Sequence, residues 1–295
     1  MPTDSTTHTE MTIAPEVAAV LDGTSQYAVV CGDATAVMAT IPSGIASVAY
    51  CDPPYGLSKQ DTASIVECLS KWLAGQVYEH GEKGFMSTEW DGHVPGPEAW
   101  REVHRALKPG GYCVAFSSTR TVDLLGIAIR LAGFELRNGW AWTFGAGFPK
   151  SLDVSKAIDS AAGAEREVIA SKASPGGWHN ASTVNDDGWS GSSQAITAPA
   201  TDDAKTWSGY GTDVKPAVEP LIVARKELQG TVAANVLAHG CGALNIDAAR
   251  IGATGARSNG GNGKRDTAAL GDYGPTQRVD YGVARYPASI AFVHD

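Results

Sequence analysis

The feature that most constrains this chain is an apolar stretch, residues 47–51, that runs directly into Asp52-Pro53-Pro54-Tyr55. A short apolar run of this length is typical of a buried β-strand. The strand must stop at the two prolines, because neither donates a backbone hydrogen bond and each holds the residue before it extended. We therefore expect the side chains of Asp52 and Tyr55 at set angles beside a pocket, although an ordinary strand-to-loop turn fits the same pattern.

Composition limits the kind of protein. The 295 residues, 43% of them hydrophobic, suffice for one large α/β domain or for a domain with an insert. The start is polar and no apolar run of about 18 residues occurs, so we expect a cytoplasmic protein of a bacterial or phage-infected cell, without membrane contact. The five cysteines form no CxxC pair, which favours free thiols and no metal site. The net charge of −9 argues against a surface coated in basic residues for nucleic acid, unless positive charge is focused in one groove or supplied by a partner.

A second strand-like run, residues 27–31, precedes Gly32-Asp33 and a helical pattern over 34–41. With the strand at 47–51, it predicts a βαβ unit whose two strands are parallel neighbours. Ligands bind beyond the carboxyl ends of such strands, so Asp33 and Asp52 are expected at one edge of the sheet. Asp33 is equally suited to cap the helix that follows it.

The rest of the chain alternates between helical and strand patterns. Helices are expected over 15–21, 61–73, 98–107, 122–132, 154–161 and 231–239, and strands over 112–116, 134–136, 139–144 and around 224–226. The polar, glycine-containing residues 78–97 predict a loop near the edge that carries Asp52. This order of elements indicates an α/β protein with a mostly parallel sheet.

The motif Asp52-Pro53-Pro54-Tyr55 after its strand resembles the catalytic motif of amino-group DNA methyltransferases, which methylate adenine N6 or cytosine N4 with S-adenosylmethionine. The segments 145–157 and 215–226 are similar to segments of phage and prophage site-specific DNA methyltransferases. The resemblance spans roughly residues 27–251. It implies a Rossmann-like, S-adenosylmethionine-dependent methyltransferase fold and double-stranded DNA as substrate, with adenine favoured over cytosine.

The resemblance also implies roles for individual residues. The target base is flipped out of the duplex and stacks on Tyr55, while Asp52 and the Pro53 carbonyl accept hydrogen bonds from its amino group; Pro54 completes the catalytic motif. Asp33 contacts the adenosine part of the cofactor, and Asp52 also borders the cofactor. No metal ion is needed.

Candidate DNA contacts lie mostly in later loops. Residues 145–157 suit contact with a DNA backbone or a flipped base, unless they only connect to the helix that follows. Residues 171–212 read as a loop-rich insert, where related enzymes carry a target-recognition region; their aromatic residues fit stacking on DNA or pinning of the loop equally well. The candidate residues are Phe148, Lys150, Lys156, Arg120, Trp178 and Trp207.

The sequence contains no Phe-x-Gly-x-Gly turn, which such methyltransferases use to bind the cofactor. Three explanations are open. The chain is truncated, or a second, separate chain supplies the missing part, or the chain is a catalytically inactive methyltransferase-like subunit that recognises DNA or scaffolds a partner. The expected protein partner is such a second chain or, alternatively, a second copy of this chain in a homodimer. The expected organisation is a tail at 1–24, an α/β domain at 25–170 and 213–251 interrupted by the insert, and a glycine-rich segment at 252–295.

Overall fold

The computed structural model describes residues 13–81, 90–145, 147, 151–173, 193–249 and 290–292. The chain forms two compact units: Met1–Thr143 with Val218–His294, and Phe144–Ala217. Within the described ranges, no helix is both long and apolar enough to cross a membrane.

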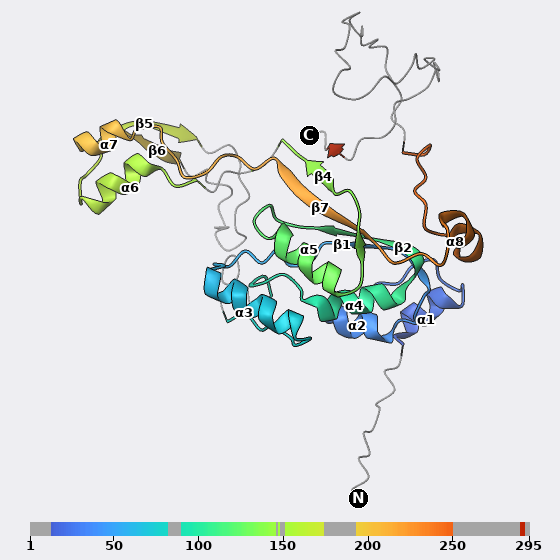
Figure 1. Cartoon of the computed structure of the whole chain (residues 1–295). Coiled ribbons are helices and arrows are strands. Elements are labelled where there is room, and N and C mark those ends of the chain that lie inside the picture. The colour runs from blue at the N-terminus through green and yellow to red at the C-terminus, as the bar shows by residue number, and fades with distance from the viewer. Residues whose placement is uncertain are drawn as a thin grey trace, which may run out of the picture. The chain divides into compact units, whose positions relative to one another are not determined.

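A mixed sheet organises the first unit (Figure 1). Its strands are β1 (Ala46–Cys51), β2 (Leu107–Phe116), β3 (Glu135–Leu136), β4 (Trp140–Thr143), β7 (Val218–Arg225) and β8 (Ile290–Phe292). The order is β1-β2-β7-β4-β8, and β3 also pairs with β7. The pairs β1–β2 and β4–β8 are parallel, whereas β7 is antiparallel to β2, β3 and β4. Of the strands in the described sheet, β7 is thus the one that runs against the others, and the predicted α/β class, with most strands in one direction, is confirmed.

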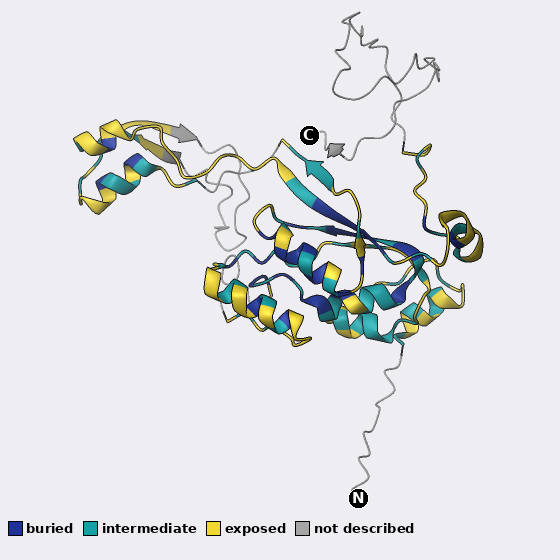
Figure 2. Ribbon diagram, viewed as in Figure 1, coloured by how far each residue is buried: buried dark blue, intermediate teal, exposed yellow. Residues whose placement is uncertain are grey.

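Helices cover one side of this sheet (Figure 1). They are α1 (Pro15–Leu21), α2 (Ala34–Thr40), α3 (Thr62–Leu73), α4 (Pro97–Ala106) and α5 (Val122–Leu131), with α8 (Val232–His239) packing against β2. Each of these helices lies where the sequence pattern predicts one. Figure 2 shows the buried residues of α4 and α5 on the surfaces that face the sheet.

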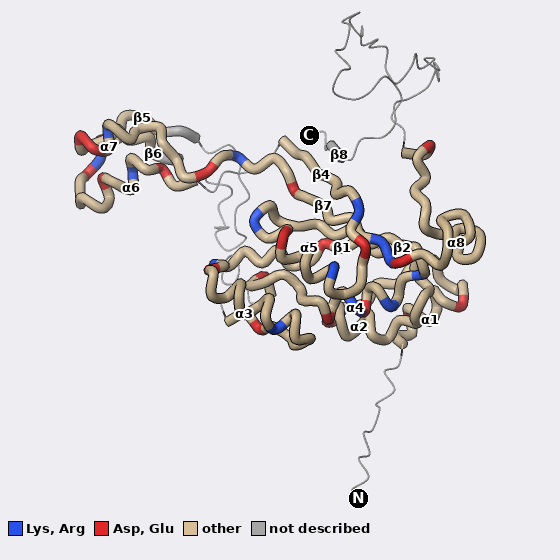
Figure 3. The backbone as a smooth tube through the Cα atoms, viewed as in Figure 1, with Lys and Arg blue, Asp and Glu red and all other residues tan. Residues whose placement is uncertain are grey.

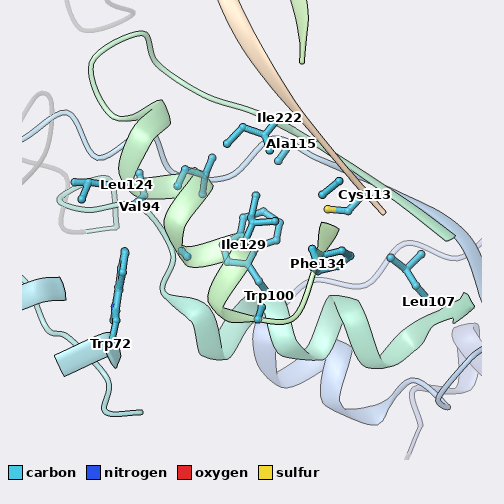
Figure 4. Packing of buried hydrophobic residues seen from close by; sticks show 14 of the residues in the cluster. Trp72, Val94, Trp100, Leu107, Cys113, Ala115, Leu124, Ile129, Phe134 and Ile222 are labelled. Atoms are coloured by element: carbon cyan, nitrogen blue, oxygen red, sulfur yellow. The ribbon is translucent and has the colours of Figure 1, made fainter. Parts of the chain in front are cut away.

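The hydrophobic core lies between the sheet and helices α3, α4 and α5 (Figure 4). Ile129 of α5, Trp100 of α4 and Cys113 of β2 are buried in it, as are Phe134 and Ala115. Burying apolar side chains in this way contributes about 25 cal/mol for each Å² removed from water. Strands β1 and β2 are parallel neighbours beside this core, with their carboxyl ends at the same edge.

Residues 27–31 are not a strand, and the predicted parallel pairing with residues 47–51 is therefore wrong. Tyr27 and Val29 are 77% and 81% exposed. A strand forms only when a neighbour takes up its backbone hydrogen bonds, and in the described part of the chain β2 is the strand that pairs with β1. The local apolar pattern is real, but it does not specify a partner.

The second unit contains α6 (Val154–Ala161), the antiparallel pair β5 (Val168–Ala173) and β6 (Ser193–Thr197), and α7 (Asp202–Thr206). Strand β6 and helix α7 fall inside the stretch that the sequence indicates as loops. A fully buried carboxylate, Asp159, accepts hydrogen bonds from the backbone N–H groups of Ala200 and Thr201 and pairs with Arg166. Burial opposes ionisation, but these hydrogen bonds and the arginine charge outweigh it and lower the pKa of Asp159 to about 2.

Candidate active site

A cavity of about 330 Å³ opens where β1 ends. It is lined by Asp52, Pro53, Tyr55, Leu57, Trp90 and Asp91. The strand stops at Cys51 because the two prolines that follow Asp52 cannot continue a hydrogen-bonded ladder. Pro54, the remaining residue of the motif, is half-buried beside the cavity's lining. The motif therefore forms a wall of a concave site at the carboxyl edge of the parallel strands, which is the usual place for ligands in such sheets.

The turn that follows the motif is held by Asp91. One carboxylate oxygen of Asp91, Oδ1, accepts hydrogen bonds from the backbone N–H groups of Tyr55 at 2.8 Å and Gly56 at 3.2 Å. The backbone N–H of Leu57 donates to the Asp91 carbonyl at 3.1 Å. Asp91 is only 7% exposed. Three successive backbone donors are thus satisfied by one residue 34 to 36 positions away, which fixes the turn in one conformation.

The loop that carries Asp91 is packed tightly against the turn. Gly56 has φ of +66°, and a Cβ there would lie 2.8 Å from the backbone nitrogen of Val94. Ser58 donates a hydrogen bond to the Gly92 carbonyl at 2.6 Å, and its hydroxyl oxygen lies 2.8 Å from Nε2 of His80. Only glycine fits the position of closest approach, so residues 55–58 and 91–94 behave as one rigid piece.

The next strand also contributes to this edge. Thr121, which follows β2, donates from its hydroxyl to the Tyr55 carbonyl at 2.6 Å. Arg120 immediately precedes Thr121 and is exposed. The structure therefore brings Arg120, one of the predicted DNA contacts, to the same edge of the sheet as the motif.

A second carboxylate approaches Tyr55 from β7. The Tyr55 hydroxyl donates to Oε2 of Glu219 at 3.4 Å. Burial, reinforced by the charges of Glu219 and Asp52, raises the pKa of Tyr55, so this hydroxyl stays protonated. Burial and the charge of Asp52 raise the pKa of Glu219 above its ordinary value. Asp52, Tyr55 and Glu219 thus form a cluster in which one phenol lies near two carboxylates.

The other predicted residues have different surroundings. The Asp33 side chain accepts a hydrogen bond from the backbone N–H of Ala36 at 2.8 Å and so caps α2. Lys156 is exposed in α6 and lines a cavity of about 240 Å³ in the second unit, together with Ser155 and Arg166. Trp207, half-exposed in the same unit, packs edge-on against Tyr210 with ring centres 4.9 Å apart. Phe148, Lys150 and Trp178 lie outside the described residues.

Three residues of the site were not singled out by the sequence pattern: Trp90, Asp91 and Glu219. The first two lie in the loop predicted near this edge, and an aromatic next to an acid in a polar loop is the signal that could have identified them. Glu219 belongs to the segment 215–226, but its role is apparent only once the fold brings its carboxylate to the Tyr55 hydroxyl.

Charge is mixed along both units (Figure 3). Lysines and arginines alternate with acids over the described chain, in keeping with the net charge of −9. Among the described residues, no group of three or more histidine, cysteine or acidic side chains is placed to hold a metal ion. The candidate site is therefore built from an exposed carboxylate, a carbonyl, aromatic side chains and a second carboxylate.

No protein-family model and no curated protein matches the sequence. Among solved structures, the chain is similar to TTHA0409 from Thermus thermophilus, which carries the name "putative DNA modification methylase", at 15% identity and a TM-score of 0.30, with 70% of this chain and 56% of that chain covered. It is also similar to M1.HpyAVI in complex with SAM, at 11% identity and a TM-score of 0.28, with 66% and 54% covered. The chain thus spans just over half the length of these proteins.

Proposed function

We propose that this chain carries the acceptor site of a site-specific DNA methyltransferase of the phage and prophage type, which transfers a methyl group from S-adenosylmethionine to an exocyclic amino group. Adenine N6 is favoured over cytosine N4. The observation that carries the proposal is that Asp52, Pro53 and Tyr55 line one cavity at the carboxyl edge of the parallel strands.

The cavity offers what an amino-bearing base requires. An exocyclic amino group has two N–H donors in the plane of the ring, and the Asp52 carboxylate and Pro53 carbonyl are acceptors. The Tyr55 ring supplies a face for stacking. When both N–H groups donate to acceptors, the nitrogen lone pair is directed away from the base plane, where it can attack a methyl group in line. Positioning and electrostatics then account for the catalysis that these residues provide.

The base must leave the duplex to reach this cavity, because its amino group is otherwise occupied in pairing. Arg120 at the same edge is proposed to contact a neighbouring phosphate. Lys156, Trp207, Phe148, Lys150 and Trp178 are proposed as further contacts of the second unit with double-stranded DNA.

The described residues fit the acceptor half of this reaction better than the cofactor half. Asp52 and Glu219 give the cavity negative potential, which suits the positive sulfonium of S-adenosylmethionine, the methyl donor. Asp33 is proposed to border the adenosine, although its carboxylate already caps α2. A glycine-rich turn after a strand beside β1 is absent from the described part of the chain.

We therefore assign the cofactor-binding turn to a second polypeptide of different sequence, because a second copy of this chain in a homodimer would lack the turn as well. The outer edge of β1 supports this, because within the described chain it has no strand partner. Val48 and Tyr50, which lie two positions apart on one face of this strand, are 59% and 62% exposed. An unpaired strand edge presents free backbone N–H and C=O groups, to which another strand adds readily.

Product analysis tests the proposal. The purified chain, alone and with any chain that co-purifies with it, is incubated with unmethylated DNA and S-adenosylmethionine, and the digested nucleosides are identified by mass spectrometry. We expect N6-methyladenine. Methylation at cytosine C5 contradicts the chemistry, and DNA binding without any methyl transfer favours an inactive recognition subunit. Calorimetry with S-adenosylmethionine separates the remaining alternatives, since binding by the isolated chain contradicts the assignment of the cofactor turn to a second polypeptide.

A further inference from the structure

Trp90 is a large aromatic residue with no place in the hydrophobic core. Its side chain is 71% exposed, whereas Trp72 and Trp100 of the same unit are each 3% exposed. It lines the cavity that also contains Asp52 and Tyr55. Leaving so much apolar surface in water costs free energy, and in a concave site such exposure is a mark of ligand contact.

The backbone at Trp90 is held in place by the residues that follow it. Asp91 binds the Tyr55 and Gly56 amides, and the Gly92 carbonyl accepts hydrogen bonds from Ser58. The Asp91 carbonyl accepts from Leu57, another residue of the cavity wall. Trp90 is thus attached directly to the rigid piece that presents the motif. An exposed ring on a fixed backbone is organised for binding before the ligand arrives, which reduces the entropy lost on binding.

We propose that Trp90 stacks on the extruded base and so forms, with Tyr55, the aromatic lining of the base pocket. This inference rests on the proposed function and assigns to Trp90 the affinity for an extrahelical base. Every base has a π-face, so stacking does not distinguish one base from another. Selection of the amino group belongs to Asp52 and the Pro53 carbonyl. Trp90 is a positioning and affinity residue that makes no contact with the transferred methyl group.

The experiment uses a duplex with 2-aminopurine opposite an abasic site, which allows the base to leave the helix at low cost. Binding of the full chain is followed by the anisotropy of a dye at the duplex end, and stacking by the emission of 2-aminopurine, which aromatic rings quench. The variants are Trp90→Ala, Trp90→Phe and Tyr55→Ala. Tyr27→Ala is the matched control, because Tyr27 is 77% exposed in the same unit and is not among the residues lining the cavity.

We expect Trp90→Ala to weaken binding of the abasic-site duplex roughly 10-fold more than it weakens binding of a fully paired duplex, which is a typical loss for one base–aromatic contact. The emission of 2-aminopurine in the bound state should rise several-fold, because one quenching ring is removed. Trp90→Phe should restore most of both signals, and Tyr27→Ala should change neither. If Tyr55→Ala changes the emission and Trp90→Ala does not, the assignment of Trp90 is overturned and the proposed function stands. If neither variant changes base binding, or the wild-type chain does not bind the duplex even with any chain that co-purifies with it, both are overturned.

Discussion

The carboxylate of Asp91 accepts hydrogen bonds from the backbone N–H groups of Tyr55 and Gly56, at 2.8 and 3.2 Å, across 36 and 35 positions of sequence. One buried side chain therefore determines the conformation in which the motif leaves β1. The pocket depends on this contact as much as on the prolines, because the prolines restrict the backbone before the turn and Asp91 restricts it after.

Replacing Asp91 by alanine should damage the site more than the fold. The two amides would lose their acceptor, at a cost of about 1–3 kcal/mol in the free energy of unfolding. Asp91→Asn keeps one carbonyl oxygen as acceptor and should be milder. Urea denaturation measures stability, and 2-aminopurine emission with the abasic duplex measures the pocket. Asp61→Ala is the control, since Asp61 accepts one backbone N–H from Ser64 at 2.9 Å, away from the cavity. Loss of stability without loss of base binding in Asp91→Ala contradicts the positioning role.

Gly56 is the position where the turn and the 91–94 loop approach most closely. Gly56→Ala would combine a strained positive φ with a contact of 2.8 Å to the Val94 backbone nitrogen. The φ alone costs about 1–2 kcal/mol. Gly44→Ala is a matched control, because Gly44 has φ of +68° and nothing lies within 4 Å of a Cβ there. Thermal unfolding of both variants should show a clearly larger decrease in Tm for Gly56→Ala, and equal decreases would mean that the loop is not rigid.

The carboxylate of Glu219 should lower the stability of the folded protein while supporting methyl transfer. Burial and the charge of Asp52 raise its pKa in the folded protein, so the folded state binds the proton more tightly than the unfolded state. The stabilisation that comes from this bound proton is fully present when the pH is below the pKa of Glu219 in the unfolded chain. It is lost as the pH rises through the pKa of Glu219 in the folded protein. Glu219→Gln removes this ionisation and should raise the Tm by about 2 °C at pH 8, with little change at pH 4.

The same variant should alter catalysis. Tyr55 keeps an acceptor in Glu219→Gln but loses it in Glu219→Ala, so we expect the rate of methyl transfer to decrease at most about threefold in the first and about 10-fold in the second. Single-turnover rates measured across pH would test this. Identical rates in Glu219→Ala and wild type would show that the hydroxyl contact at 3.4 Å does not orient the ring.

The stability of the second unit should depend on the ionisation of Asp159. The pKa of Asp159 is lowered to about 2 by its hydrogen bonds and by Arg166. A carboxyl group whose pKa is lower in the folded protein than in the unfolded chain stabilises the fold at any pH above its unfolded-state pKa. This stabilisation is lost as the pH falls toward the pKa of the folded state. Unfolding of the second unit, followed by hydrogen exchange of β5 and β6, should become easier between about pH 4 and pH 2. Asp159→Asn should abolish this pH dependence, and an unchanged dependence would assign it to other groups.

Local sequence patterns predicted much of the fold because they report local preferences. Asp33, a good N-cap, marks the start of α2, the helical spacing over 61–73 marks α3, and the Asp52-Pro53-Pro54 stop marks the end of β1. Pairing depends on distant residues, which is why residues 27–31 were wrongly expected to join β1. Dependence on distant residues also explains why only part of the site was predicted. Tyr55 was identified from its own motif, but its partners Asp91 and Glu219 lie 36 and 164 positions away and become neighbours only when the sheet and loop are formed.

The central claim is that Asp52 and Tyr55 present an extruded amino-bearing base for methylation. The most direct measurement compares methyl transfer from S-adenosylmethionine to unmethylated DNA by wild-type chain and Asp52→Ala, each with any co-purifying chain, while anisotropy records DNA binding. We predict that Asp52→Ala loses transfer by at least about 100-fold, as expected when a group that stabilises the transition state is removed, and binds DNA within about twofold of wild type. Equal methylation by the two proteins would contradict the account.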